Sequence, residues 1–206
     1  MNYREKNESE EMEKDKFVYA CTTNDVAYVK TALEKDRQLA DIKKENGMTV
    51  LLIASLQGYK EIVELLISHG ANVNMQCETM QNENALICAS YKGHKDIVEL
   101  LLDNGADINA RKNDGMDALM WASSRGYKDV AELLIDKGAD VNRKDYDGFT
   151  PLMFAAQEGQ IHLVEFLISK GAKVNDDNDG TTAIKLAYKG KHFDIVELLE
   201  QHGARW

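Results

Sequence analysis

One segment recurs along this chain at a nearly constant spacing. Its four clearest copies begin at Gly58, Gly93, Gly126 and Gly159, and all fit the pattern G-x-x-x-[ILV]-[AV]-E-[FL]-L-[IL]-x-x-G-A-x-[IV]-N. The leading glycines are separated by 93 − 58 = 35, 126 − 93 = 33 and 159 − 126 = 33 residues. A divergent copy precedes them, and a degenerate copy, HFDIVELLEQHGARW, comes last. A period of this length predicts a row of small structural units, each of which buries its apolar face against its neighbours.

Each unit is predicted to contain two helices separated by a glycine. In TPLMFAAQEG, Thr150 can cap a helix, and Pro151 suits the first helical position because an N–H there would have no partner. Gly159 permits a positive φ and ends this helix, and a second helix with a wide apolar stripe follows until Gly171. Since a helix of about nine residues is not stable alone in water, the units must stack on one another.

The repeated residues resemble the ankyrin repeat, whose pattern is G-x-T-P-L-H-x-A-A-x-x-G-H-x-x-I-V-x-x-L-L-x-x-G-A-D-V-N. The copy that starts at Gly148 carries the resemblance best, since it matches at Thr150, Pro151, Gly159 and Gly171 among other positions. The resemblance implies an all-α ankyrin-repeat solenoid of stacked helix-turn-helix units with β-hairpin-like finger loops.

The resemblance covers residues 14–206, which we expect to form one ankyrin repeat domain. Residues 1–13 are expected to be a charged, frayed N-terminal lead-in. The six expected repeats lie near residues 14–45, 46–80, 81–113, 114–146, 147–178 and 179–206.

Three departures from the family pattern predict local differences. The family's histidine after the leucine is replaced in these repeats, for instance by Met120, so the family's hydrogen bond between Thr and His is not expected. The connector after Asn74 is two residues longer than its neighbours, which predicts an enlarged finger around Met75–Met80. In the last repeat Lys191 takes the place of the mid-repeat glycine, and Gly190 stands one position early.

The charge of the chain argues against a nucleic-acid partner. The formal net charge is -10 and the pI is near 5.0, and such a surface repels phosphate backbones. The sequence holds no run of Lys and Arg with interleaved aromatic residues. It also lacks an apolar run of the roughly 20 residues that span a bilayer, and MNYREKNESEEMEKDK lacks the apolar core of a Sec-type signal peptide. We therefore expect a cytoplasmic monomer with neither a nucleic-acid nor a membrane partner.

The cysteines favour a reducing compartment, because three scattered residues do not make a disulfide framework. Cys77 falls in the long finger and is expected to be an exposed thiol. Cys21 and Cys88 fall at helical positions beside an alanine and are expected to be buried.

Nothing in the sequence indicates catalysis or a bound metal. The histidines lie in different repeats and do not converge on one site, and His69 and His202 precede Gly-Ala turns, where a cation can meet helix-end carbonyls. No HExxH, paired CxxC, GxSxG or phosphate-binding glycine loop occurs. We therefore predict that the chain is not an enzyme and has no catalytic residue, metal site or cofactor.

Two further series recur once per repeat. One is a glutamate of the second helix, expected to lie on a solvated outer face: Glu64, Glu99, Glu132, Glu165 and Glu197. The other is an asparagine expected to bond to the backbone of a turn, as in the family: Asn74, Asn109, Asn142 and Asn175.

The resemblance implies that a partner contacts the finger tips and the first helices. Carried over position by position, it gives the predicted partner-binding residues Met48, Tyr91, Met116, Trp121, Arg125, Tyr146, Phe149 and Phe154. Aromatic residues and Arg are enriched at interface hot spots, and an exposed apolar series in a connector indicates a partner. For Trp121, packing between first helices and exposure in a groove are equally well supported.

The sequence thus predicts a non-enzymatic protein-protein interaction module that binds another protein through its concave face and finger loops. The identity of that partner is not readable from the residues. Two alternatives stay open: a translocated effector acting on host proteins, and a regulatory or inhibitory subunit of an enzyme.

Overall fold

The computed structural model describes residues 3–206, with side chains from residue 11 onward. This part of the chain contains twelve α-helices, two 3₁₀-helices and two strands of two residues each, which confirms the expected all-α class. The helices form two compact units. Unit 1 contains the residues up to Ala89 together with Asp96–Ala106, and unit 2 contains Ser90–Lys95 together with Asp107–Trp206.

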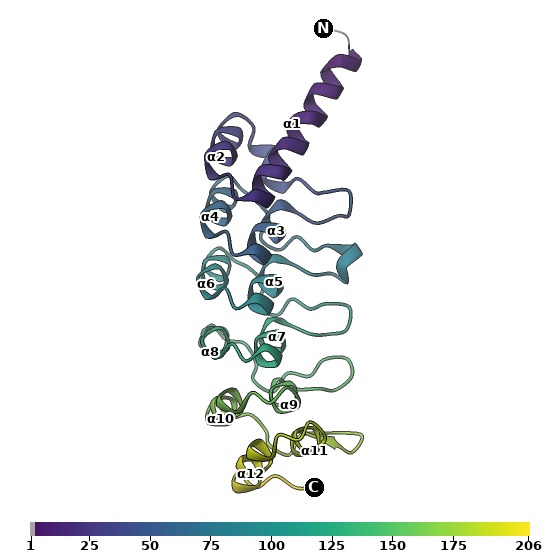
Figure 1. The fold of residues 1–206 in the computed structure, drawn as a ribbon, viewed down its shortest axis with the longest axis vertical. Coiled ribbons are helices and arrows are strands. Elements are labelled where there is room, and N and C mark those ends of the chain that lie inside the picture. The colour runs from purple at the N-terminus through teal and green to yellow at the C-terminus, as the bar shows by residue number, and fades with distance from the viewer. Residues whose placement is uncertain (1–2) are drawn as a thin grey trace. The chain divides into compact units, whose positions relative to one another are not determined.

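The helices come in consecutive pairs, one pair for each repeat (Figure 1). The six pairs are α1 (Tyr3–Thr23) with α2 (Val26–Lys35), α3 (Val50–Gln57) with α4 (Lys60–Ser68), α5 (Ala85–Lys92) with α6 (Lys95–Asp103), α7 (Ala118–Arg125) with α8 (Lys128–Asp136), α9 (Pro151–Gln157) with α10 (Ile161–Ser169), and α11 (Ala183–Lys189) with α12 (Phe193–Gln201). The 3₁₀-helix η1 (Arg37–Asp41) follows α2, and η2 (Glu78–Met80) lies in the finger before α5.

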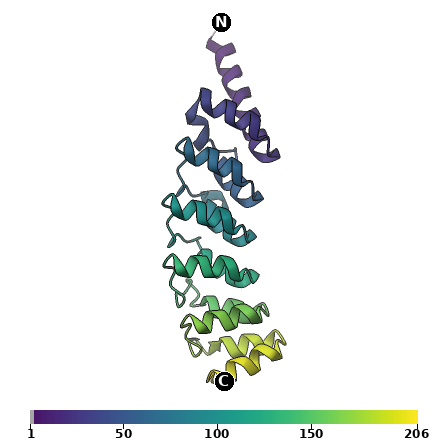
Figure 2. The same cartoon turned by 90° about the vertical axis from the view of Figure 1, so that its left-hand side faces the viewer.

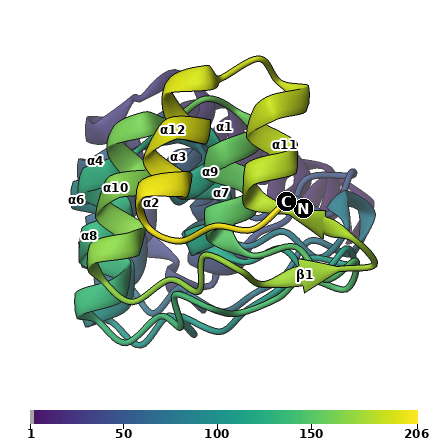
Figure 3. The ribbon, with the colours of Figure 1, turned by 90° about the horizontal axis from the view of Figure 1, so that it is seen from below.

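In unit 2 the helices form two rows. The first helices α7, α9 and α11 pack against one another in sequence order, and α10 contacts both α8 and α12. Figure 2 shows the second row, α8, α10 and α12, in green to yellow. The fingers extend from the side of the first helices (Figure 1). The last finger is a hairpin in which β1 (Asp177–Asn178) pairs antiparallel with β2 (Thr181–Thr182), beside α11 (Figure 3).

The N-terminal segment is helical. α1 begins at Tyr3 and continues without a break through Phe17 and Cys21, whose side chains are fully buried. Residues 3–23 contain neither glycine nor proline and are rich in Glu and Lys, which favour a helix. The side chains of residues 11–16 are all exposed. The segment expected to be a frayed lead-in and the first helix of the first repeat are therefore one element.

Short polar side chains cap the first helices, as expected from Thr150 and Pro151. The Thr150 hydroxyl accepts a hydrogen bond from the Met153 N–H at 3.3 Å, and Pro151 is the first residue of α9. In α7 the Asp117 carboxylate plays the same part and accepts from the Met120 N–H at 3.0 Å. These caps fix the starts of α7 and α9, and with them the points at which the preceding fingers end. At the start of α11, Thr182 makes no such bond.

Between the two helices of every repeat, one residue adopts a left-handed backbone conformation. These residues are Asn24, Gly58, Gly93, Gly126, Gly159 and Lys191. At Gly126 φ is 76°, and the following N–H, of Tyr127, donates to the Ala122 carbonyl at 3.0 Å. Glycine enters this region without steric strain, which explains its recurrence. Lys191 adopts it with φ 64°, while Gly190 beside it stays right-handed.

The recurring asparagines join the turn of one repeat to the turn of the next. The Asn142 Nδ2 group donates to the Gly171 carbonyl at 3.1 Å, and its Oδ1 accepts from the Lys173 N–H at 2.8 Å. Asn74 and Asn175 donate in the same way at 2.9 Å, to Gly105 and Gly203 respectively. The expected bonds to turn backbone are thus confirmed at these three positions. At Asn109 the side-chain oxygen instead accepts a hydrogen bond from the Arg143 guanidinium.

The long finger in unit 1 corrects one expectation. Cys77 was expected to be an exposed thiol, but it is 1% exposed and packs in an apolar cluster with Leu52 and Cys88. The cause is that the finger folds back on itself: the Cys77 N–H donates to the Glu83 carbonyl at 2.8 Å, and η2 occupies the extra length. Cys21 and Cys88 are buried, as expected.

Candidate functional site

Seven of the eight predicted partner-binding residues belong to unit 2. Tyr91 lies near the end of α5, Trp121 and Arg125 lie in α7, and Phe154 lies in α9. Met116, Tyr146 and Phe149 come from the fingers before α7 and α9. Met48 belongs to unit 1, where it is partly buried and packs against the cluster of Leu52, Cys77 and Cys88.

The structure brings Tyr91, Trp121 and Arg125 into direct contact. The rings of Tyr91 and Trp121 meet edge to face with centroids 5.0 Å apart and an interplanar angle of 89°. The Arg125 guanidinium lies over the Tyr91 ring, with Cζ 4.3 Å from the centroid, and donates a hydrogen bond to the Tyr91 hydroxyl. Lys92 approaches the same ring, with Nζ 5.2 Å from the centroid. Together with Lys112 we call these residues the Tyr91 cluster.

Trp121 turns out to be both packed and accessible. One side of the indole is occupied by Lys112, whose Nζ lies 4.9 Å from the ring centroid, and another by the edge contact with Tyr91. The side chain is nevertheless only partly buried. Its Nε1 is itself buried and makes no hydrogen bond to any group that the structure describes. Both roles weighed for this residue are therefore present at once.

The two fingers of this region contribute a second set of aromatic side chains. Tyr146 is 68% exposed, and the Arg111 guanidinium lies over its ring at 5.5 Å. The Tyr146 N–H donates to the Asp114 carbonyl at 3.2 Å, and a Cβ placed on Gly115 would meet the Tyr146 nitrogen at 2.5 Å. The two fingers thus approach so closely that the site requires glycine at position 115.

The apolar residues of these fingers are less exposed than the sequence suggested. Phe149 and Phe154 pack on each other with centroids 5.7 Å apart and are partly buried. Met116 is only 9% exposed. Most of the accessible surface of the site therefore comes from Tyr146 and Arg125, with the rings of Tyr91 and Trp121 partly open.

Acidic side chains near the site serve the backbone. Burial raises the pKa of the Asp117 carboxyl, although the hydrogen bond from the Met120 N–H and the charge of Arg143 oppose this shift. Burial likewise raises the pKa of Asp145, whose Oδ1 accepts from the Phe149 N–H at 2.7 Å. These carboxylates hold the helix start and the finger turn in place.

The expected structural roles of the histidines hold where the structure tests them. Nδ1 of His69 lies 2.8 Å from the Leu65 carbonyl, and Nδ1 of His202 lies 2.8 Å from the Leu198 carbonyl, each at the end of its helix. Among the described side chains, no three His, Cys, Asp or Glu residues gather closely enough to hold a metal ion. The glutamates recurring on the second helices are all exposed, as expected.

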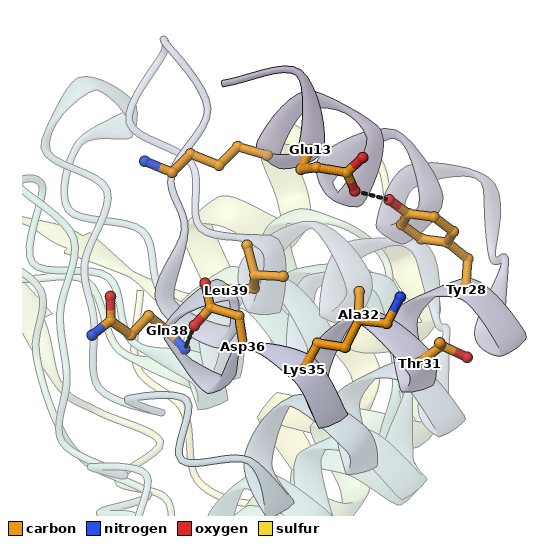
Figure 4. A pocket seen from close by; sticks show the side chains of 9 residues that line it. Glu13, Tyr28, Thr31, Ala32, Lys35, Asp36, Gln38 and Leu39 are labelled. Carbon is orange, nitrogen blue, oxygen red and sulfur yellow. Dashed lines mark hydrogen bonds between the residues drawn. The ribbon is translucent and has the colours of Figure 1, made fainter. Parts of the chain in front are cut away.

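A hollow of about 490 Å³ in unit 1 was not anticipated from the sequence (Figure 4). It lies between α1, α2 and η1, and the Tyr28 hydroxyl hydrogen-bonds to a Glu13 oxygen at 3.0 Å across its rim. That bond lowers the pKa of Glu13. The other lining residues named in Figure 4 include Lys35, Asp36 and Gln38, and Asp36 caps η1 by accepting from the Gln38 N–H. The polar groups of this hollow are thus engaged in local structure.

Tyr91, Trp121 and Arg125 are among the predicted partner-binding residues, whereas Arg111 and Lys112 are not. Both precede α7 by several residues, in a finger where the sequence pattern does not fix the direction of a side chain. The only available signal was that Arg111 stands 33 residues, one repeat period, before Lys144 in the next finger.

The described helices do not meet the requirements of a membrane span. Across residues 3–206, none is both long enough and apolar enough to cross a bilayer.

Comparison with known proteins assigns the chain to a family. The family described as "Ankyrin repeats" matches in three copies, at residues 5–77, 75–145 and 144–206. A 55-residue stretch is 40% identical to the acyl-CoA-binding domain-containing protein 6 homolog of Dictyostelium discoideum. The matched stretch covers 27% of this chain and 19% of that protein. The chain therefore spans only about a fifth of that relative. Ankyrin repeats are generally protein-protein interaction modules, and the family is typically non-enzymatic. Since the three copies together span nearly all of the sequence, the chain belongs to the ankyrin repeat family.

Proposed function

We propose that this chain is a non-enzymatic module that binds a partner protein through the Tyr91 cluster and the adjoining fingers of unit 2. The observation that carries the proposal is the contact of Arg125 with the Tyr91 ring, which itself meets the edge of Trp121. Aromatic rings and Arg dominate the energetics of protein interfaces. Here they lie at a surface that is partly open to solvent.

The cluster is held in place before any partner arrives. Arg125 is fixed by its hydrogen bond to Tyr91 as well as by its position over the ring. Binding normally requires long side chains to lose rotamer freedom, at roughly 0.5–1.5 kcal/mol each. A guanidinium already held against a ring loses less of that freedom, so the arrangement favours recognition by a rigid surface.

The proposal is tested by comparing partners captured by matched variants. Arg125→Ala and Tyr146→Ala are combined in one variant, because both side chains are exposed and their removal leaves the core intact. The control is Lys128→Ala with Glu132→Ala, two exposed residues of α8 on the second row of helices. Proteins retained from a lysate of the source organism are then quantified by mass spectrometry.

We expect one group of proteins to be retained by the wild type and the control but lost from the Arg125–Tyr146 variant. If all three forms retain the same proteins in the same amounts, the site assignment is wrong. Helical circular dichroism of each form verifies that the fold is unchanged. The monomeric state and the cytoplasmic location remain predictions, and light scattering on the purified chain tests the former.

A further inference from the structure

Three cations of unit 2 rest on aromatic rings instead of pairing with carboxylates. Lys92 and Arg125 both lie over the Tyr91 ring, at 5.2 Å and 4.3 Å from its centroid. Arg111 lies over the Tyr146 ring at 5.5 Å. Within the side chains that the structure describes, none of these three cations forms an ion pair with an acidic residue.

Other cations of the same unit do pair with acids. Lys144 lies 3.7 Å from the Asp176 carboxylate, and Lys170 lies 3.1 Å from that of Asp136. The whole chain carries 35 acidic and 25 basic residues, so acidic groups are in excess. Lys92, Arg111 and Arg125 thus keep positive charges that no described carboxylate neutralises by direct contact, and an external anion can meet them.

Two acidic side chains of this region, Asp114 and Asp117, bind backbone amides. Asp114 Oδ1 accepts from the Met116 N–H at 2.9 Å, and Asp117 Oδ1 accepts from the Met120 N–H at 3.0 Å. Both bonds stabilise turns, at the finger and at the start of α7. The charge of Arg111 acts on the Asp117 carboxylate, but among the described side chains neither acid forms an ion pair with Arg111, Lys92 or Arg125, so the N–H groups of these cations stay available to an external acceptor.

We propose that the partner presents a linear acidic segment whose Asp or Glu carboxylates bind Arg125, Lys92 and Arg111. This inference rests on the proposed function and specifies the chemistry of the partner. A guanidinium carries five N–H donors, of which Arg125 directs one to the Tyr91 hydroxyl, so the others can bind a carboxylate. Apolar side chains of the same segment contact the exposed ring of Tyr146 and the open part of Trp121.

A protein segment fits this surface better than a nucleic acid does. A nucleic acid carries a phosphate charge on every nucleotide, so even a short stretch extends past three cations onto a chain whose net charge is -10. Carboxylates of a peptide can instead be spaced to meet the cations alone. The chemistry of the site therefore favours a few separated negative charges with apolar residues between them.

The test begins with a random linear peptide library displayed on phage and selected against the full chain. Selection is repeated with Lys92→Gln combined with Arg125→Gln, and with Lys128→Gln as the matched control. Lys128 is exposed and also lies over a ring, that of Phe166 at 5.7 Å, so the control removes the same kind of charge and contact from the second row of helices.

One selected peptide is then synthesised together with a copy in which Asn and Gln replace Asp and Glu. A length of about 10 residues spans roughly 33 Å when extended, which reaches across neighbouring fingers. Binding of both peptides, and of an oligothymidylate of equal length, is measured by titration calorimetry at low and high salt.

We expect the selected peptides to be enriched in Asp and Glu, and the amide copy to bind at least about tenfold more weakly. Arg125→Gln with Lys92→Gln weakens binding to a similar degree, Lys128→Gln leaves it unchanged, and added salt weakens it through screening. Failure to enrich any peptide, or enrichment without an excess of acidic residues, overturns the inference. Tighter binding of the oligothymidylate overturns it in favour of a nucleic acid. In each of these cases the proposed function still stands if the captured proteins depend on Arg125 and Tyr146.

Discussion

Lys191→Gly should stabilise the last repeat. Lys191 sits at the turn between α11 and α12 with φ 64°, a conformation that the corresponding turn between α7 and α8 assigns to Gly126. The Lys191 side chain is exposed and makes no hydrogen bond or ion pair within the described residues, so its removal sacrifices no contact of that kind. The substitution therefore changes the free energy of unfolding only through the backbone conformation at position 191.

The size of the effect follows from two opposing contributions. The left-handed conformation is unfavourable for a residue with a Cβ by roughly 1–2 kcal/mol. Glycine loses more backbone entropy on folding, which offsets roughly 0.5–1 kcal/mol of that gain. The net stabilisation is about 0.5–1 kcal/mol. For a chain of 206 residues, this corresponds to a rise in Tm of about 1–4 °C.

The assay is thermal unfolding followed by circular dichroism, with two variants at equivalent turns for comparison. Gly126→Ala should lower the Tm, because φ is 76° there and the new Cβ would also crowd the Gln160 Oε1, the end of a side chain that can move aside. Asn24→Gly should raise it less than Lys191→Gly does, because Asn tolerates the left-handed region better than Lys. An unchanged or lower Tm for Lys191→Gly, with Gly126→Ala behaving as expected, would refute the reasoning.

Two further predictions concern buried ionisable groups. Since burial raises the pKa of Asp117 in the folded state, the folded state binds the proton more tightly than the unfolded state, and the stability contributed by this group falls as pH rises through that pKa. Asp117→Asn keeps a capping oxygen, so the free energy of unfolding of the variant in urea, relative to that of the wild type, should increase from about pH 4 to about pH 7. A difference that is constant with pH would contradict this. Burial raises the pKa of the Cys21 thiol to about 12, and Cys77 and Cys88 are 1% and 2% exposed, so iodoacetamide at neutral pH should leave all three unmodified in the native protein and label them after unfolding, as mass spectrometry would report.

The repeat register is the part of the structure that could be predicted most completely. The spacing of Gly126 and its counterparts defines where each pair of helices reverses, and small polar residues such as Thr150 define where the first helix begins. Both features depend on the local backbone, so a short stretch of sequence is enough to predict them. The same reasoning identified the last repeat as irregular, because Lys191 stands where a glycine is expected.

The finger loops could be predicted less well, because their side chains are oriented by contacts that no local pattern encodes. Cys77 is buried only because its finger folds back to pair with Glu83. Met116 is buried, although its position before a first helix leaves either an inward or an outward side chain possible. In both cases length and composition indicated a loop without indicating which residues it encloses.

For the candidate site, the repeat pattern predicts which positions are equivalent in successive repeats, but not which contacts their side chains make. The repeat period places Lys92 and Arg125, 33 positions apart, at the same point of successive first helices, with Tyr91 one position before Lys92. It does not reveal that Arg125 lies over the Tyr91 ring, or that Lys92 shares it. Such contacts depend on side-chain rotamers, which are determined by packing against neighbouring repeats. The pattern of apolar residues does not predict these rotamers.

The positions of the two tryptophans have a practical consequence for spectroscopy. Trp206 is 58% exposed at the last repeat, whereas Trp121 lies beneath Lys112 and against the edge of Tyr91. Replacing Trp206 with Phe would leave a single indole, so the intrinsic emission of the chain would originate at the Tyr91 cluster. The protein thus contains its own optical probe at the surface where a partner is expected, and a ligand can be titrated there without attaching a label.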